Sequence, residues 1–320
     1  MSHLMSFWKL VTNDSQDIVV SIRRDPLSPC APEQLSAGAL VVQLEIHGHR
    51  LKYKKALGDG PETGWVNVRM DLVRQSNELL IEDDASPGSS SLVGHEFFLK
   101  ADGANLKGYC VWDKSFGEGK RPLVMHLPSV LGMTSFDYER TECMARMGYV
   151  GLMVDTYGNG YSTEDVRVNR NQCWSLMMYC LGDRAAFRRR LLPFFAWGTQ
   201  HPQVDPDKTA AYGYCYGAAA CMELVRAKTG ISGVVCFHSY DVANAELGKI
   251  QRGNSSRVLF LHGTHDYVCS ASEIQDVLME CKNADVDANV IWYKGGSHGF
   301  AHRPNGGPGY SAELDQQSWR

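Results

Sequence analysis

The 320-residue sequence lacks an uninterrupted apolar stretch of the roughly 18 residues that a membrane-spanning helix requires. Its first nine residues, MSHLMSFWK, lack the charged start and apolar run of a secretory signal. The chain also lacks a strong charge bias, because 32 basic and 36 acidic residues leave a net charge of −4. We therefore expect a cytoplasmic protein that binds neither nucleic acid nor a membrane surface.

The ten cysteines lack a repeated spacing, and no C-x-x-C pair occurs. In a chain with 44% apolar residues, this pattern indicates reduced thiols rather than the disulfide framework of a small secreted domain. The close histidine pairs, His47 with His49 and His262 with His265, have no cysteine neighbours at the spacing of zinc ligands. We therefore expect neither a metal site nor a cofactor.

Residues 1–88 have the pattern of a small β-rich domain. Alternating apolar and polar residues, clearest at 41–46 and 65–70, predict strands with one buried face. The segment DDASPGSSS at 83–91 has the composition of a linker and places a domain boundary near residue 88. The strands predicted in this domain are residues 17–24, 39–46, 51–57, 65–70 and 78–81. The role of this domain stays open between formation of a homodimer, capping of a pocket and docking of a partner.

Residues 89–320 alternate between apolar strands and helical stretches, after two strands at 94–100 and 105–112. The further strands expected are residues 123–127, 149–154, 209–214, 231–237, 257–262 and 287–293. The helices expected are residues 135–147, 172–200, 217–228 and 270–283. Apolar strands separated by helices predict an α/β fold with a mostly parallel sheet covered on both faces. In such a sheet, active residues lie on loops at the carboxyl ends of the strands.

The segment G-Y-C-Y-G at residues 213–217 lies between a predicted strand and a predicted helix. It matches the G-x-nucleophile-x-G elbow, a sharp strand-to-helix turn that exposes a strained nucleophile. The partial positive charge at the N-terminus of the helix favours a thiolate at Cys215. The alternative is a small buried thiol, because such a short motif also occurs by chance.

Two later residues stand where the partners of a nucleophile belong. Asp266 follows the strand at 257–262, and His298 lies in a glycine-rich loop after the strand at 287–293. Taken alone, each is also explained as an ordinary turn or loop residue. The order nucleophile, acid, base is that of α/β-hydrolases. We therefore predict Cys215 as nucleophile, His298 as base and Asp266 as the residue that orients the base.

Acyl transfer also needs backbone N–H groups that bind the oxyanion. We predict those of Tyr216, directly after the nucleophile, and of Val130, in the loop after the first core strand. The bulky residues Tyr161, Trp174, Tyr214 and Tyr216 are candidates for the pocket wall. For Tyr161 and Trp174, a place in the core or on the surface is at least as good an explanation.

From about residue 92 onward, the sequence resembles the dienelactone hydrolase family. The resemblance rests on the elbow at 213–217, the His-Gly-x-x-Asp run that begins at His262, and the segment G-S-H-G-F-A at 296–301. It implies an α/β-hydrolase fold, a Cys-His-Asp triad and the opening of small unsaturated lactones through an acyl-enzyme. The β-rich residues 1–88 are not part of the usual family pattern, and the closing helix is expected to be short or missing.

The chain departs from the family at two places that bear on substrate. Well-known members have a glutamate before the first oxyanion donor, where this chain has Ser129. They also have an arginine four residues after the histidine, where this chain has His302, followed by Arg303. We therefore name Ser129, His302 and Arg303 as substrate-binding candidates. The departures argue against a small dianionic lactone as substrate.

Three functions remain in view. Hydrolysis of a small-molecule ester or lactone through an acyl-enzyme is the leading hypothesis. A non-hydrolytic cyclase, isomerase or acyltransferase of a biosynthetic pathway is the second, because Ser129 replaces a carboxylate and an extra domain is attached. A binding or scaffold protein without turnover is the third, although an intact triad has no evident structural use.

Overall fold

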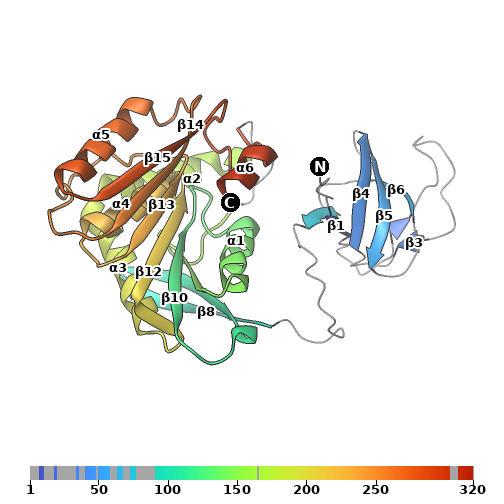
Figure 1. Ribbon diagram of the computed structural model, residues 1–320, viewed down its shortest axis with the longest axis horizontal. Helices are drawn as coiled ribbons and strands as arrows, with labels where there is room; N and C mark the ends of the chain where they lie inside the picture. Colours follow the sequence, from blue (N-terminus) through green and yellow to red (C-terminus); the bar gives the residue numbers. More distant parts are fainter. Residues whose placement is uncertain are drawn as a thin grey trace. The chain divides into compact units, whose positions relative to one another are not determined.

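The computed structural model describes residues 91–163, 166–302 and 309–319, together with the strands found before residue 77. The chain divides into two compact units, Met1–Gly88 and Ser89–Arg320. In Figure 1, colours from blue to red follow the elements of the two units in the order of the chain. Apart from Ser91, the predicted linker at 83–91 lies outside the described residues.

The first unit contains antiparallel strands. They are β1 (Phe7–Leu10), β2 (Ile18–Val19), β3 (Gln34–Leu35), β4 (Leu40–His47), β5 (Arg50–Leu57), β6 (Thr63–Asn67) and β7 (Val73–Ser76). One sheet has the order β6-β5-β4-β1-β7, and a second pairs β2 with β3. Strands β4, β5 and β6 lie where alternation predicts strands, whereas β1, β3 and β7 are too short for alternation to reveal. Of the other predicted strands, 17–24 is described only at β2 and 78–81 lies outside the described residues.

The second unit is built on one mixed sheet. Its strands are β8 (Leu92–Ala101), β9 (Ala104–Asp113), β10 (Arg121–Leu127), β11 (Val150–Val154), β12 (Val204–Tyr214), β13 (Gly233–Phe237), β14 (Arg257–Gly263) and β15 (Asp287–Tyr293). The order is β15-β14-β13-β12-β10-β11-β9-β8, with β10 to β15 parallel. Strands β8 and β9 form an antiparallel hairpin that joins the sheet through β11. The predicted α/β-hydrolase fold with a mostly parallel sheet is confirmed.

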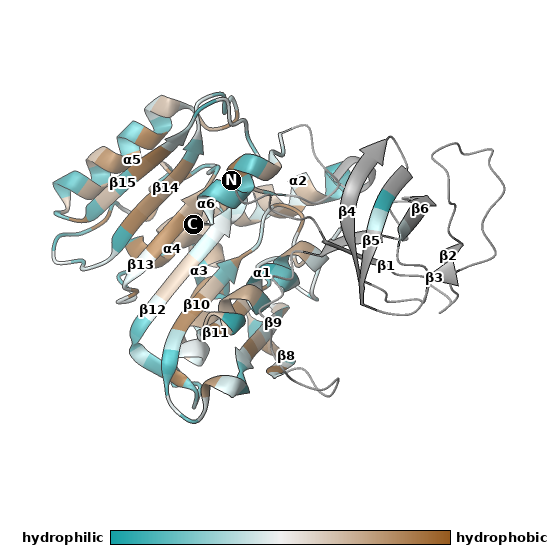
Figure 2. Cartoon of the chain, turned by 45° about the vertical axis from the view of Figure 1, so that its right-hand side comes forward, coloured by the Kyte–Doolittle hydropathy of each residue, from teal (hydrophilic) through white to brown (hydrophobic). Residues whose placement is uncertain are grey.

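Helices cover both faces of this sheet. They are α1 (Ser135–Arg146), α2 (Val166–Gly182), α3 (Arg184–Gln200), α4 (Tyr216–Arg226), α5 (Ala271–Asn283) and α6 (Ala312–Ser318), with a 3-10 turn η1 (Lys114–Phe116). Apolar side chains of α2, α3, α4 and α5 form one core cluster with the sheet, and those of α1 and α6 pack in a second. Figure 2 shows the hydrophobic colour of β10, β13 and β14, which these two clusters bury.

The single helix predicted at 172–200 is wrong, because the structure has two helices, α2 and α3, that meet at Asp183. The Asp183 carboxylate accepts a hydrogen bond from the amide of Ala186 at 2.8 Å and so caps the start of α3. Helix α2 also begins earlier than predicted, at Val166. Apolar residues continue through the break, and their spacing alone therefore does not reveal it.

The order of the strands sets where the site can form. Strand β12 lies between β10 and β13, and its last residue, Tyr214, pairs with Phe237 at the end of β13. Strands β14 and β15 follow β13 in parallel, so the loops after β12, β13, β14 and β15 leave the same edge of the sheet.

Candidate active site

Cys215 occupies the sharp turn between β12 and α4, with φ 54° and ψ −114°. The turn brings two backbone segments too close for any side chain at its flanks. A Cβ atom at Gly213 would collide with the carbonyl of Gly217, and one at Gly217 would collide with the carbonyl of Leu127. Both flanking positions therefore require glycine, which is the physical reason for the G-x-C-x-G pattern.

Backbone hydrogen bonds fix this turn to the neighbouring strand. The amide of Cys215 donates to the carbonyl of Phe237 at 3.0 Å, and the amide of Tyr240 donates to the carbonyl of Cys215 at 3.2 Å. Tyr216 is the first residue of α4, so its amide has no acceptor within the helix and points out of the helix end. The Tyr216 side chain is buried, with its hydroxyl 2.9 Å from the hydroxyl of Thr156.

Asp266 follows β14 and has a fully buried side chain. Its Oδ1 accepts hydrogen bonds from the amides of Val268 at 2.9 Å and Cys269 at 3.0 Å, and its Oδ2 lies 3.0 Å from Nδ1 of His298. Burial alone would raise the pKa of this carboxyl. The hydrogen bond and charge of His298, with the two amides, outweigh burial and hold the pKa of Asp266 below its ordinary value.

His298 lies in the loop after β15, with 17% of its side chain exposed. Burial disfavours its charged form, but the charge of Cys215 and hydrogen bonds to Asp266 and Cys215 raise the pKa of His298 to about 10. The imidazole is therefore protonated at neutral pH in this arrangement. The structure thus brings Cys215, Asp266 and His298, the three predicted catalytic residues, into one cluster.

The loop after β10 carries the second predicted oxyanion donor, Val130, which is half-buried. The carbonyl of Val130 accepts a hydrogen bond from the hydroxyl of Tyr157 at 3.4 Å. Ser129 is buried, and its hydroxyl accepts a hydrogen bond from the amide of Leu131 at 3.3 Å. Ser129 therefore stabilises the loop itself, where family members have a carboxylate.

Two of the residues predicted to line the pocket are partly exposed to solvent. Tyr161 is half-buried, and its hydroxyl lies 3.5 Å from the sulfur of Cys173. Trp174, which follows Cys173 in α2, is 36% exposed, and its ring lies 6.1 Å from the ring of Tyr240. Both therefore remain candidates for substrate contact.

The predicted place of Tyr214 in the pocket wall disagrees with the structure. Tyr214 is fully buried among the side chains on the α1 and α6 face, and its hydroxyl accepts a hydrogen bond from Nε1 of Trp319 at 3.1 Å. Successive residues of a strand point to opposite faces of the sheet, so adjacency to Cys215 in sequence does not bring the Tyr214 ring to the site. The ring of Tyr216 is likewise buried, so that residue can act only through its backbone.

His302 does not supply the positive charge of the family arginine. Its ring packs against those of Phe136 at 4.8 Å and Tyr214 at 5.7 Å. Burial, opposed by the charge of Asp137, lowers the pKa of His302 to about 4, so the ring is neutral at physiological pH. Arg303 lies outside the described residues.

Sequence reasoning missed two residues that follow β13. Tyr240 contacts the nucleophile turn through its backbone, as described above. The ring of His238 is buried and stands edge-on to that of His298 at 5.1 Å. Burial, helped by the charge of His298, holds the pKa of His238 well below its ordinary value. No motif marks either residue, but the rule that active residues follow parallel strands would have pointed to both.

The described residues show neither a membrane-spanning helix nor a cluster of metal ligands. No helix among them is long and apolar enough to cross a bilayer. They also contain no group of three or more His, Cys, Asp or Glu side chains that could hold a metal ion.

Comparison with known proteins shows to which family the second unit is similar. The model of the dienelactone hydrolase family matches residues 106–320. A curated relative, carboxymethylenebutenolidase of Pseudomonas sp. (strain P51), is 27% identical over 202 residues, which cover 61% of this chain and 80% of the relative. The solved structure of m3DLH is 26% identical, with a TM-score of 0.63, and covers 72% of this chain and 95% of its own. That of a dienelactone hydrolase-like promiscuous phosphotriesterase from metagenomic libraries is 27% identical, with a TM-score of 0.60 and the same coverage.

Proposed function

Because the chain belongs to the dienelactone hydrolase family, we propose that this hydrolase cleaves a carboxylic ester or lactone with Cys215 as its nucleophile. One observation carries the proposal: a strained, half-buried cysteine stands beside a histidine whose other side faces a buried carboxylate. Asp266 holds that histidine at 3.0 Å through Nδ1 and leaves Nε2 for the reaction. This is the arrangement of an activated nucleophile with an oriented base.

In the proposed reaction, the Cys215 thiolate attacks the substrate carbonyl carbon and forms a tetrahedral intermediate. The amides of Tyr216 and Val130 donate to its oxyanion. The intermediate collapses to a thioester as His298 protonates the leaving alcohol, which in a lactone stays attached to the acyl group. Neutral His298 then takes a proton from water, which attacks the thioester and releases the acid. The expelled thiolate and protonated His298 restore the starting state.

The choice of ester or lactone follows from the relatives. The curated relative is named for cleavage of a butenolide lactone, and the second solved structure is named a promiscuous phosphotriesterase. Both names describe hydrolysis of an ester bond by a protein similar to this unit. We therefore place carboxylic esters and lactones first and phosphotriesters second as substrates for this chain.

A non-hydrolytic cyclase or acyltransferase is the second candidate. It is favoured by Ser129, a buried hydroxyl bonded to the loop where well-known family members carry a carboxylate beside the thiol. Product mass separates the two functions, because hydrolysis adds one water and cyclisation adds none.

The test is hydrolysis of a panel of activated esters and small lactones by the wild type and by Cys215→Ala, with intact-mass detection of an acyl adduct. We expect turnover and the adduct to disappear together in Cys215→Ala. Cys143→Ala, which removes an exposed thiol, is the matched control and should retain both. Full turnover by Cys215→Ala would rule out the proposed nucleophile. An adduct without hydrolysis in the wild type would favour acyl transfer.

A further inference from the structure

Aromatic residues lie near the turn that holds Cys215. On one side, Tyr240 is tied to the carbonyl of Cys215 through its amide, and its ring packs edge-on against the ring of Trp174 in α2. Trp174 is 36% exposed, so part of its ring is open to a ligand. This pair forms a wall that begins beside the nucleophile and extends to the surface of the molecule.

A second aromatic pair lies next to the predicted oxyanion loop. Tyr157 bonds the carbonyl of Val130, and its ring packs edge-on against that of Tyr161 at 5.8 Å. The Tyr161 hydroxyl reaches Cys173, the residue before Trp174 in α2. The middle of α2 therefore contacts both pairs.

Two carboxylates lie near Tyr240. Burial raises the pKa of Tyr240, and the next largest contributions come from the negative charges of Asp241, Cys215 and Glu273. Arg184 bonds the Asp241 carboxylate at 2.5 Å, so a buried guanidinium balances the charge of Asp241. The charge of Glu273 therefore disfavours a substrate carboxylate at Tyr240.

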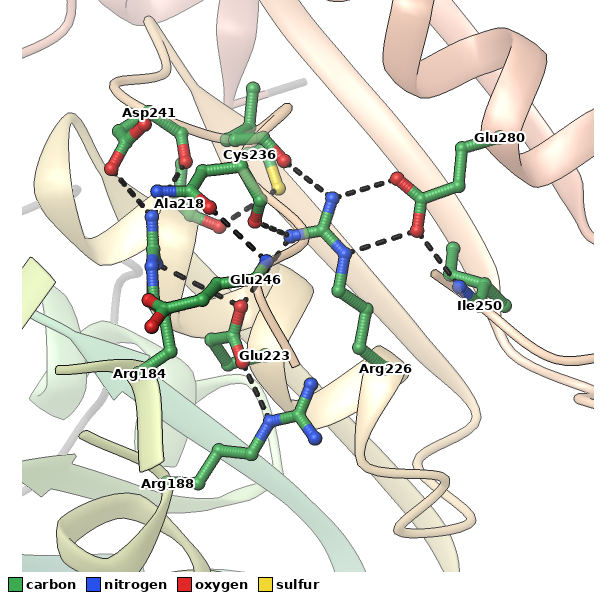
Figure 3. Close-up of polar contacts among 12 residues, drawn as sticks. Arg184, Arg188, Ala218, Glu223, Arg226, Cys236, Asp241, Glu246, Ile250 and Glu280 are labelled. Atoms are coloured by element: carbon green, nitrogen blue, oxygen red, sulfur yellow. Dashed lines mark hydrogen bonds and ion pairs between the residues drawn. The ribbon is translucent and has the colours of Figure 1, made fainter. Parts of the chain in front are cut away.

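The turn that carries Tyr240 has a strained backbone. His238 and Asp241, on either side of Tyr240, have positive φ angles of 33° and 52°. Arg184 bonds both the carbonyl of Asp241, at 3.0 Å, and its carboxylate (Figure 3). Strained conformations of this kind persist only where the surroundings fix them. The Tyr240 ring is therefore presented in a fixed position.

We propose, resting on the function proposed above, that the acyl portion of the substrate is uncharged and aromatic and packs against Trp174 and Tyr240. The leaving group departs toward His298, which gives it a proton and whose ring neighbour is His238. The acyl portion stays on Cys215 and extends along the wall. Aromatic rings favour such edge-to-face contacts, and the Glu273 carboxylate disfavours an anion.

The test compares p-nitrophenyl esters of phenylpropanoic, cyclohexylpropanoic and carboxyphenylpropanoic acids. These esters share one leaving group and differ only far from the carbonyl, so their intrinsic reactivity is matched. We expect kcat/KM of the wild type to fall in the order phenyl, cyclohexyl, carboxyphenyl. Trp174→Leu should lower the phenyl-to-cyclohexyl ratio about fivefold, the size of one lost aromatic contact.

Gln172→Ala, which truncates an exposed side chain on another face of the same helix, is the control and should leave the ratio unchanged. Preference for the carboxyphenyl ester, or an unchanged ratio in Trp174→Leu, would overturn the substrate class while Cys215→Ala still abolished turnover. Turnover of all three esters by Cys215→Ala would instead overturn the nucleophile itself. The two failures are therefore distinguishable.

Discussion

At the scale of single residues, Cys215 is held in a conformation that a non-glycine residue avoids. Positive φ at such a position costs about 1–3 kcal/mol. Backbone bonds from Cys215 to Phe237 and from Tyr240 to Cys215 fix the turn on both sides. The strain is therefore offset by the sheet, and the sulfur is presented at the end of β12 beside His298.

The pH dependence of acylation follows from His298. Its pKa of about 10 keeps the imidazolium available as the proton donor up to that pH, far above the value near 6.5 of a free histidine. Asp266→Asn removes a hydrogen bond and a charge that raise this pKa, so the alkaline limit of acylation should move down. Single-turnover formation of the acyl adduct from an alkyl ester, whose alkoxide must be protonated to leave, measures that limit for both proteins by intact mass across the neutral and alkaline range.

The free energy of unfolding should fall as the pH rises through the pKa of His298. A histidine whose folded pKa is raised stabilises the fold fully below its unfolded pKa, and this stabilisation is lost as pH rises through about 10. In the acylation experiment, Asp285→Asn alters an exposed carboxylate and is the control for a general effect of removing one negative charge. An alkaline limit that is identical in Asp266→Asn would contradict the role assigned to Asp266.

The proximity of Cys215, Asp266 and His298 could be predicted from sequence, because each stands in a motif or directly after an apolar strand. The aromatic wall could be predicted only in part. Trp174 was a candidate, but Tyr240 follows β13 without any motif, and its position depends on a bond to Cys215 that only the fold creates. Tyr214 shows the opposite error, since adjacency in sequence suggested a contact that strand alternation forbids.

At the scale of elements, buried ion pairs join α3, α4 and α5. Glu223 of α4 accepts hydrogen bonds from Arg188 at 2.6 Å and Arg226 at 3.4 Å. Arg226 in turn bonds both carboxylate oxygens of Glu280 in α5, at 3.0 and 2.8 Å. Figure 3 shows Glu223 between the arginines. The pairs fix the helices that pack behind the nucleophile turn.

Removing Glu223 should destabilise the protein strongly. Glu223→Ala leaves the buried guanidinium of Arg226 with one carboxylate fewer, and breaking a buried pair in this way costs about 3–5 kcal/mol. The exposed pair of Arg252 and Asp285 is the control, because Arg252→Ala should change stability by only about 0–1 kcal/mol. Urea unfolding of both variants measures the difference, and equal losses would contradict the role of the buried pairs.

The elements themselves were predictable to different degrees. Strands β10, β11, β13 and β14 are largely buried and therefore read as apolar runs. The break between α2 and α3 was missed, because Asp183 acts through one local capping bond while the apolar spacing continues across it. Strand β12 begins earlier than predicted, at Val204, beyond a register shift against β10 that no sequence pattern marks.

At the scale of the whole molecule, the second unit has its own core. The described members of its two core clusters come from residues between Phe97 and Trp319. The family match, at residues 106–320, also lies inside this unit. A domain of this size buries enough surface to fold alone.

A chain that begins at Ser89 should therefore fold and react without residues 1–88. We expect one cooperative thermal transition, because the two clusters share a single sheet. We also expect acylation at Cys215, because Asp266 and His298 belong to the same unit. The same shortened chain with Cys215→Ala is the control, and it should melt alike but form no adduct. A shortened chain that melts cooperatively yet forms no adduct would mean that the first unit contributes to the site, whereas one that fails to melt cooperatively would mean that it contributes to the fold.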